Sequence, residues 1–231
     1  KLIKAKEEGK LPKALIPVHL SGQSCDMKKI HDLSKIYGFK IIEDASHAIG
    51  GEYNRKPVGS CQFSDITVFS FHPVKIITTC EGGACITNDE KLYKKIYNLR
   101  SHGIVRNQKD MINTKHGSWY YEQKTLGFNY RLNDLQAALG INQIKKLNKF
   151  IENRHKIAQQ YDELFKENQN IETPYQLKKS YTSYHLYIIK VSNNQDFKRK
   201  EIFDRLRAKG YLVNVHYIPI YKHPYYSADF D

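Results

Sequence analysis

The chain has 231 residues, of which 40% are hydrophobic and 12% aromatic, so it can bury the core of one large domain or two small ones. Its formal net charge of +13 is spread along the sequence and comes without a recognised binding signature, which argues against a nucleic-acid partner. No apolar run has transmembrane length, no signal peptide opens the chain, and the 4 cysteines lack paired zinc spacing, so we expect a cytoplasmic protein with free thiols, no membrane partner and no metal.

The first half of the chain predicts a sheet with parallel strands. Ala14 to Leu20 and Phe39 to Asp44 are apolar runs, and the segment between them, Ser24 to Tyr37, has the pattern of a helix closed by Gly38. This strand, helix and strand form one right-handed crossover unit, which makes the two strands parallel. Further strands are expected at residues 65–71 and 83–87, and an amphipathic helix at 89–100.

The second half of the chain predicts mainly helices. Residues 103–124 are polar and have no clear period, as in a long loop. Helical spacing runs from Leu135 to Phe165, with a bend near Asn148, and would lead from a large domain, residues 1–145, into a smaller one, residues 146–231. In the smaller domain we expect a loop at 174–183, a strand at 184–191, a helix at 197–209 and a strand at 211–217.

Two of the predicted strand ends carry side chains that suit one kind of cofactor. The strand at 65–71 contains Ser70 near its end and is followed by Lys75, and the strand that ends at Asp44 is followed by His47. Open α/β sheets bind ligands at the carboxyl ends of their parallel strands, so Asp44 and Lys75 should face one cleft. A lysine, a carboxylate, a hydroxyl and an imidazole at one edge match the needs of pyridoxal phosphate, which forms a Schiff base with lysine and pairs its ring nitrogen with Asp.

Several sequence blocks, taken in order, resemble the nucleotide-sugar aminotransferases of the DegT/DnrJ/EryC1/StrS family. These blocks are residues 42–50, 69–75, 81–84, 100–104 and 127–132. Members of that family are fold-type I pyridoxal phosphate enzymes, so the resemblance implies an α/β large domain with a mostly parallel sheet and a smaller α+β carboxyl-terminal domain. Residues 1–145 would be the remainder of the cofactor-binding domain and residues 146–231 part of the small one, because the chain starts late and stops early against the family pattern. We therefore expect it to be truncated at both ends.

Blocks at residues 44–48, 70–75, 185–187 and 215–221 are similar to one branch of this family. Members of that branch move an amino group from L-glutamate to C4 of a UDP-4-keto-6-deoxy-N-acetylhexosamine during the biosynthesis of pseudaminic acid, a surface sugar. The resemblance thus implies a nucleotide-sugar and L-glutamate as substrates. It also implies a homodimer with shared active sites.

The resemblance implies a role for each residue at the strand ends. Lys75 would hold the cofactor and then act as the base that moves a proton between carbons. Asp44 would keep the pyridine nitrogen protonated, and His47 would contact the ring or its phenolic oxygen. Ser70 would donate its hydroxyl to the phosphate, and Asn129 would reach the phosphate of the neighbouring subunit.

Substrate contacts are implied further along the chain. Arg131 is either a clamp for the glutamate carboxylate or part of an interface ion pair, and both interpretations stay open. A tyrosine- and histidine-rich segment would lie over the nucleotide-sugar, and its residues are Asn214, Val215, His216, Tyr217 and, beyond them, Tyr226. The alternative for this segment is a core strand with a buried aromatic face.

Other functions remain as alternatives. An aminotransferase that acts on another keto-sugar nucleotide stays open, because loops that the sequence does not place determine which sugar stereochemistry is bound. A dehydratase branch of the family replaces the Schiff-base lysine with histidine, and Lys75 argues against it. A fragment without catalytic activity that serves as a binding module is the third alternative.

Overall fold

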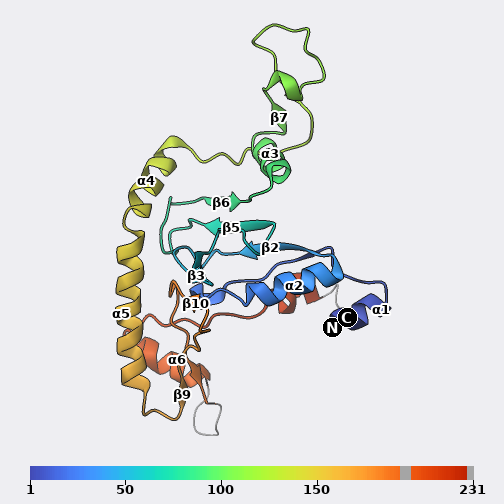
Figure 1. Ribbon diagram of the computed structural model, residues 1–231. Coiled ribbons are helices and arrows are strands. Elements are labelled where there is room, and N and C mark those ends of the chain that lie inside the picture. Colours follow the sequence, from blue (N-terminus) through green and yellow to red (C-terminus); the bar gives the residue numbers. More distant parts are fainter. Residues whose placement is uncertain (193–198, 228–231) are drawn as a thin grey trace. The chain divides into compact units, whose positions relative to one another are not determined.

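The computed structural model describes residues 1–192 and 199–227 (Figure 1). The contacts within the chain divide it into two compact units, of which the first contains Lys1–Leu164 and Tyr175–Ile188 and the second contains Phe165–Pro174 and Ile189–Asp231. The first unit is therefore discontinuous in sequence. The boundary expected at residue 145 concerns the two domains of a whole enzyme fold, and it stays a prediction.

A 4-stranded sheet forms the centre of the first unit. It contains β1 (Ala14–Leu15), β2 (Lys40–Asp44), β5 (Ile66–Ser70) and β6 (Gly83–Ile86), in the order β1-β2-β5-β6. The first three of these strands run parallel, and β6 is antiparallel to β5. The predicted α/β class is thus confirmed, with a mixed sheet.

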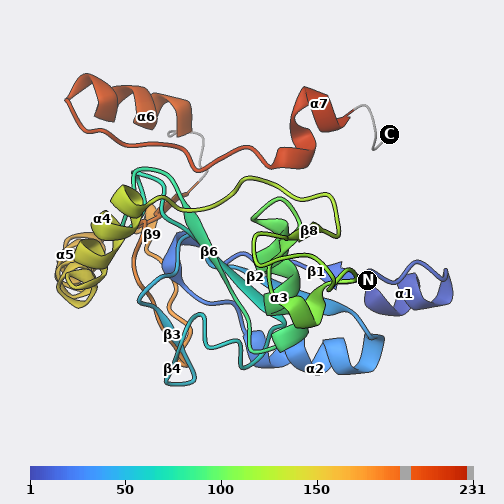
Figure 2. The same ribbon diagram turned by 90° about the horizontal axis from the view of Figure 1, so that it is seen from above.

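The helix α2 (Met27–Tyr37) leads from β1 to β2 and packs against β2 (Figures 1 and 2). Met27 at its start and Ile41 in β2 are each only 1% exposed and belong to one buried cluster. Gly38 ends the helix in the left-handed conformation, at φ 78°, which glycine adopts without a steric clash. The predicted order of strand, helix and strand is confirmed, but the first strand is shorter than expected, because Leu20 already belongs to the 3-10 helix η1 (Leu20–Gly22), and the helix begins at Met27 instead of Ser24.

Most of the other elements are short. In chain order they are α1 (Leu2–Glu7), η1 (Leu20–Gly22), β3 (Glu52–Tyr53), β4 (Lys56–Pro57), α3 (Glu90–Leu99), β7 (Ile104–Val105), η2 (Gln108–Asp110), β8 (Glu122–Gln123), α4 (Asp134–Ile144), α5 (Leu147–Phe165), β9 (Ile171–Glu172), β10 (Ser180–Tyr181), β11 (Lys190–Val191), α6 (Arg199–Ala208), η3 (Ile220–Lys222) and α7 (Pro224–Ser227). β10, β3 and β4 form an antiparallel sheet, and β7 pairs with β8 and β9 with β11.

The helix predictions agree with these bounds. α3 begins after Asp89, whose carboxylate accepts hydrogen bonds from the N–H groups of Lys91 and Leu92. The long helical segment is divided into α4 and α5 close to the expected bend at Asn148. Residues 103–124 are only partly a loop, because β7 and β8 pair near its two ends. Of the helix expected at 197–209, residues 197 and 198 lie outside the described residues.

Two strand predictions are wrong. In residues 184–191 only Lys190–Val191 is a strand, because the backbone before it bonds to η1 and to a side chain of α5 instead of to a neighbouring strand. The N–H of Leu186 donates to the carbonyl of Ser21, and the guanidinium of Arg154 donates to the carbonyl of Tyr184. Residues 211–217 contain no strand, and their large apolar side chains are mostly exposed, so aromatic composition alone misled the prediction.

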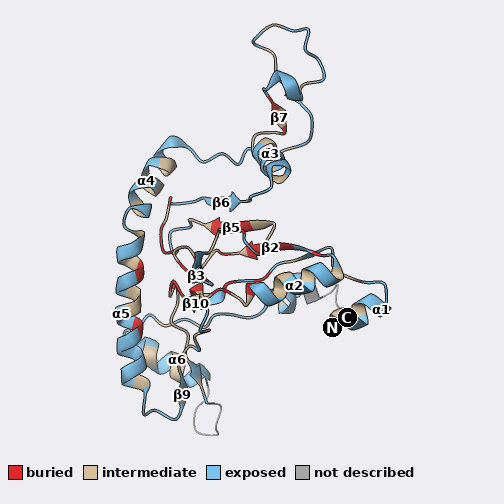
Figure 3. Cartoon of the chain, in the orientation of Figure 1, coloured by how far each residue is buried: buried red, intermediate tan, exposed pale blue. Residues whose placement is uncertain are grey.

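The buried residues are concentrated around β2 and β5 (Figure 3). The helices α3 and α4 have no buried residue, and α5 buries only Ile151 and Ala158. Between residues 1 and 227, leaving aside 193–198, no helix combines the length and apolar character that crossing a lipid bilayer requires.

Replacing Tyr53 with phenylalanine should lower the free energy of unfolding by about 1–2 kcal/mol near neutral pH. Tyr53 is 4% exposed, and its hydroxyl donates to Asp26 Oδ1 at 2.5 Å. Burial and this hydrogen bond raise the pKa of Tyr53 to about 12. The same bond, with the help of Lys29, holds the pKa of Asp26 below its ordinary value of 3.8.

The pH dependence of this difference follows from the two pKa shifts. The neutral phenol is favoured in the folded state, so its contribution is complete below pH 10 and is lost as the pH rises towards 12. The carboxylate contributes above pH 3.8 and loses its contribution as the pH falls below that value. Urea unfolding of Tyr53→Phe at several pH values measures this. Tyr37→Phe is the control, because Tyr37 packs against the same cluster without a hydroxyl hydrogen bond among the described residues; equal losses in both variants would contradict the prediction.

Candidate active site

Three of the predicted site residues lie along one edge of the sheet. β2 and β5 are parallel neighbours, and their register pairs Asp44 with Val68, so Ser70 follows at the same edge. Lys75 belongs to the turn after β5, where its N–H donates to the carbonyl of His72 at 2.9 Å. The structure therefore agrees with the expectation that these strand ends meet at one edge. That Asp44 and Lys75 face one cleft stays a prediction.

The turn that carries Lys75 is held in place by the buried residues that follow it. Ile76 and Ile77, directly after the lysine, are 5% and 3% exposed and pack against Ile151 of α5. The N–H of Thr79 donates a hydrogen bond to the carbonyl of Phe71 at 3.0 Å and closes the turn. Lys75 itself is half-buried, and its ammonium makes no hydrogen bond or ion pair within residues 1–192 and 199–227. A fixed backbone thus presents an amine that is available for chemistry.

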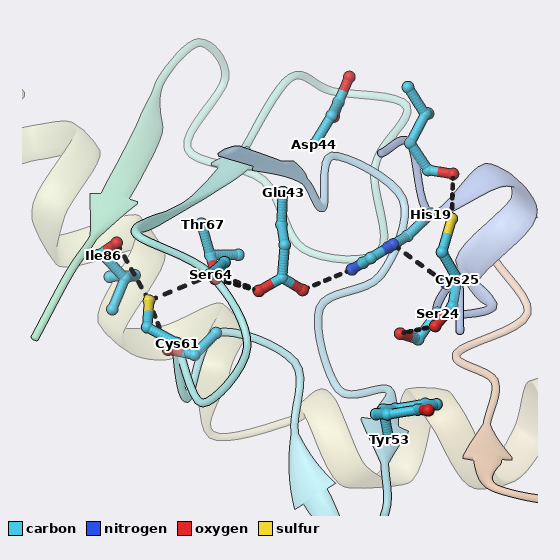
Figure 4. Close-up of polar contacts among 12 residues, drawn as sticks. His19, Ser24, Cys25, Glu43, Asp44, Tyr53, Cys61, Ser64, Thr67 and Ile86 are labelled. Atoms are coloured by element: carbon cyan, nitrogen blue, oxygen red, sulfur yellow. Dashed lines mark hydrogen bonds and ion pairs between the residues drawn. The ribbon is translucent and has the colours of Figure 1, made fainter. Parts of the chain in front are cut away.

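Asp44 is fixed by its backbone on both sides. Its N–H donates to the carbonyl of Pro17 at 2.9 Å, and its carbonyl accepts from the N–H of His19 at 3.0 Å. Its carboxylate points away from that of Glu43, because neighbouring residues of a strand face opposite sides (Figure 4). Asp44 Oδ1 accepts from the N–H of Ser46 at 3.0 Å, which orients the carboxylate at the strand end.

His47 lies between two segments that are far apart in the sequence. Its Nδ1 accepts a hydrogen bond from the N–H of Ser21 at 3.3 Å, and its carbonyl accepts one from the hydroxyl of Ser183 at 2.9 Å. The imidazole of His185 lies 4.3 Å away, measured between ring centroids. Sequence reasoning did not predict Ser21 or Ser183 as neighbours, because only the folded chain brings the three segments together.

Ser70 ends β5 opposite a glycine of β6. Its Oγ accepts from the N–H of His72 at 3.4 Å, a long bond that leaves the hydroxyl able to donate elsewhere. The partner residue is Gly83, and a Cβ built there would lie 2.6 Å from the carbonyl oxygen of Phe69. A side chain at position 83 would therefore clash with β5, and glycine allows the two backbones to approach this closely.

The remaining predicted residues are not brought to this edge by any contact that the structure describes. Asn129 is exposed and forms an isolated antiparallel bridge with Ser101, and Arg131 is exposed. The proposed substrate residues belong to the second unit, and these are Asn214, Val215, His216, Tyr217 and Tyr226. Asn214 Oδ1 accepts from the N–H of Val215, and Tyr217 stacks against a neighbouring histidine. Their approach to Lys75 stays a prediction.

The described residues contain no group of three or more His, Cys, Asp or Glu side chains placed to hold a metal ion. The side chains at the sheet edge are instead a primary amine, a carboxylate, an imidazole and a hydroxyl. This set can bind an aldehyde, a protonated ring nitrogen and a phosphate. The donor chemistry of the edge therefore fits pyridoxal phosphate.

A model of the DegT/DnrJ/EryC1/StrS aminotransferase family matches residues 1–231. The chain belongs to this family. It is 42% identical over 214 residues to a UDP-4-amino-4,6-dideoxy-N-acetyl-beta-L-altrosamine transaminase of Campylobacter jejuni, covering 93% of this chain and 54% of the relative. A transaminase of the same name from Helicobacter pylori is 38% identical over 219 residues, covering 95% of this chain and 56% of the relative. The chain thus spans about half the length of these DegT-family relatives.

Solved structures of the DegT family are similar to the chain. Helicobacter pylori PseC, an aminotransferase involved in the biosynthesis of pseudoaminic acid, has a TM-score of 0.86 and 37% identity, covering 96% of this chain and 56% of that one. The PLP-form of the putative sugar aminotransferase Spr1654 from Streptococcus pneumoniae has a TM-score of 0.79 and 30% identity, covering 95% and 58%. These similarities confirm the aminotransferase fold; the details of the small domain stay a prediction.

Proposed function

We propose that the protein containing this chain is a pyridoxal phosphate-dependent aminotransferase. It transfers the amino group of L-glutamate to C4 of a UDP-4-keto-6-deoxy-N-acetylhexosamine in pseudaminic-acid biosynthesis. The observation that carries the proposal is the sheet edge with Asp44, Ser70 and Lys75, in a chain whose DegT-family match covers every residue. The names of the similar transaminases support the substrate class.

The proposed chemistry assigns separate tasks to the edge residues. Pyridoxal phosphate, when bound, supplies an electron sink for the charge that develops on carbon as a proton leaves. Lys75 would hold the cofactor covalently and, once the incoming amine has freed its Nζ, take up and return that proton. Asp44 would accept a hydrogen bond from the protonated ring nitrogen and preserve its charge.

The other residues would bind and orient. Ser70 would donate its hydroxyl to the phosphate, and His47, held by Ser21, would lie against the ring or its phenolic oxygen. We further propose that the protein is a cytoplasmic homodimer in which Asn129 reaches the partner's phosphate. Arg131 would bind the glutamate carboxylate or an interface carboxylate. The segment Asn214–Tyr217, with Tyr226, would cover the nucleotide-sugar.

Mass spectrometry of reaction products tests this function. The intact gene product that contains this chain is incubated with ¹⁵N-labelled L-glutamate and a panel of UDP- and dTDP-linked keto-sugars. We expect the label in a 4-amino product of the UDP-4-keto-6-deoxy-N-acetylhexosamine, together with 2-oxoglutarate. Faster amination of a different keto-sugar would replace the substrate assignment, and a soluble protein without cofactor attachment or product would support a non-catalytic binding module. Omission of glutamate is the control.

A further inference from the structure

A chain of buried polar side chains crosses beneath β2, on the face opposite to Asp44 (Figure 4). His19 is 0% exposed and Glu43 5% exposed, and His19 Nε2 lies 2.7 Å from Glu43 Oε2. The other carboxylate oxygen accepts hydrogen bonds from the hydroxyls of Ser64 and Thr67. Within the part of the chain that the structure describes, the hydrogen bonds of the Glu43 carboxylate therefore come from side-chain donors.

Both ring nitrogens of His19 have a defined role. The N–H of Cys25 lies 3.3 Å from His19 Nδ1, and Nε2 faces Glu43 Oε2, so each ring nitrogen has its own partner. Burial alone would raise the pKa of Glu43, but the hydrogen bonds from His19, Ser64 and Thr67 outweigh it and hold the pKa below its ordinary value. Glu43 is therefore an ionised carboxylate in the core.

Such a pair is a poor source of stability. Removing a carboxylate from water costs several kcal/mol, and apolar residues of similar volume in place of a buried pair are often neutral or stabilising. The clearest attested benefit of buried polar pairs is that they fix one geometry.

The backbone of His19 connects the two strand-end residues that are assigned to the cofactor. Its N–H donates to the carbonyl of Asp44 at 3.0 Å, and its carbonyl accepts from the N–H of Gly22 at 3.2 Å. The second bond closes a tight turn in which Ser21 has φ 59°, a conformation that non-glycine residues rarely adopt. In this turn the N–H of Ser21 is directed at Nδ1 of His47.

The turn cannot move freely, because its other side is packed. A Cβ at Gly22 would lie 2.5 Å from the hydroxyl oxygen of Ser183 and 2.9 Å from the backbone nitrogen of Tyr184. The turn therefore depends on His19 on one side and on residues 183–184 on the other. A shift of the His19 ring would be transmitted to both Asp44 and His47.

We propose that His19 and Glu43 are positioning residues of the active site, which fix the turn 19–22 and through it the carboxylate of Asp44 and the ring of His47. The proposal rests on the cofactor roles of Asp44 and His47 under the proposed function. Neither His19 nor Glu43 touches the cofactor in this arrangement. They act from the opposite face of the sheet, through backbone hydrogen bonds.

The first test measures hydrogen exchange in the protein without cofactor. The variants are His19→Gln and Glu43→Gln, the second of which keeps the shape of the side chain if the first does not fold. We expect the N–H of Ser21 to exchange at least about tenfold faster in either variant, after correction for global stability, as for the loss of one supporting hydrogen bond. An unchanged rate at Ser21 in a folded variant overturns the proposal.

Cys61→Ala is the matched control for this test. Cys61 is 8% exposed and contacts Thr67 and the carbonyl of Ile86 at the far end of the same polar chain, without a described bond to His19 or to the turn. It should lower the melting temperature without a local change at Ser21. Equal acceleration in all three variants would mean that the pair only contributes to core stability, and it would overturn the proposal.

The second test adds pyridoxal phosphate to the intact protein. We expect His19→Gln and Glu43→Gln to bind it about tenfold more weakly and to change the visible circular dichroism per bound cofactor, which reports ring orientation. After borohydride reduction the cofactor should still be found on the peptide with Lys75. Unchanged affinity and dichroism overturn the proposal. If the parent protein itself binds no cofactor, the proposed function fails, and the hydrogen-exchange test still decides whether the pair positions the turn.

Discussion

Replacing Lys75 with alanine should abolish covalent cofactor attachment and reduce transamination by more than about 10⁴-fold in the intact protein, since covalent binding and proton transfer are lost together. The fold should survive, because Lys75 is only half-buried and the turn is anchored by Ile76 and Ile77. Product formation and borohydride trapping followed by peptide mapping measure the two losses.

Two further variants distinguish the positive charge of Lys75 from its ability to form a covalent bond with the cofactor. Lys75→Arg keeps the positive charge but cannot form the bond, so it should be as inactive as the alanine variant. Lys40→Ala removes a lysine of the same sheet whose ammonium lies 3.0 Å from Asp65, and it should retain full activity. Covalent attachment in Lys75→Ala, at any other lysine and with turnover, would refute the assignment.

Replacing Asp44 with asparagine should lower kcat by about 10²–10⁴-fold while the protein still folds and binds pyridoxal phosphate. Asparagine can accept the hydrogen bond from the N–H of Ser46 that Asp44 Oδ1 accepts now, so the local backbone is preserved. It cannot stabilise a protonated ring nitrogen by charge, and the electron sink is therefore weakened. Single-turnover kinetics with glutamate measures the proton-transfer step directly.

Asp65→Asn is the matched control for this prediction. Asp65 is also a carboxylate of this sheet, but it comes directly before the start of β5; its carboxylate accepts from the N–H of Ile41 at 2.9 Å and pairs with Lys40. Loss of its charge should lower stability and leave kcat unchanged. A normal proton-transfer rate in Asp44→Asn, or an equal loss in Asp65→Asn, would exclude the specific role of Asp44.

The sequence predicts the parts of this fold that depend on local pattern. The apolar runs on both sides of α2, and Gly38 at its end, are enough to predict that β1 and β2 are parallel. That arrangement in turn predicts the edge of the sheet at which Asp44 lies. Lys75 could be placed just beyond this edge because it follows the strand that ends at Ser70, with Pro73, which cannot continue a strand, between them. These inferences need only neighbouring residues and the rule that parallel strands end at the same edge.

The sequence does not predict contacts that only the folded backbone creates. His19 and Glu43 are separated by 24 positions, and a histidine inside an apolar run gave no signal of a buried partner. The alternation of side chains along β2 was a usable signal that was missed, because it places Glu43 and Asp44 on opposite faces. The prediction of a strand at 184–191 was wrong for a related reason: the backbone of this segment is hydrogen-bonded to Ser21 and Arg154, both distant in sequence.

Residues 175–188 belong to the first unit although they follow α5, so a shortened gene has to keep them. Thr182 and Ser183 are 4% and 0% exposed, so they are interior residues although they come after the helix α5. An expression vector that stops at the end of α5 would delete part of the core and leave unsatisfied backbone groups at Gly22. Any recombinant piece meant to fold independently has to extend beyond Ile188.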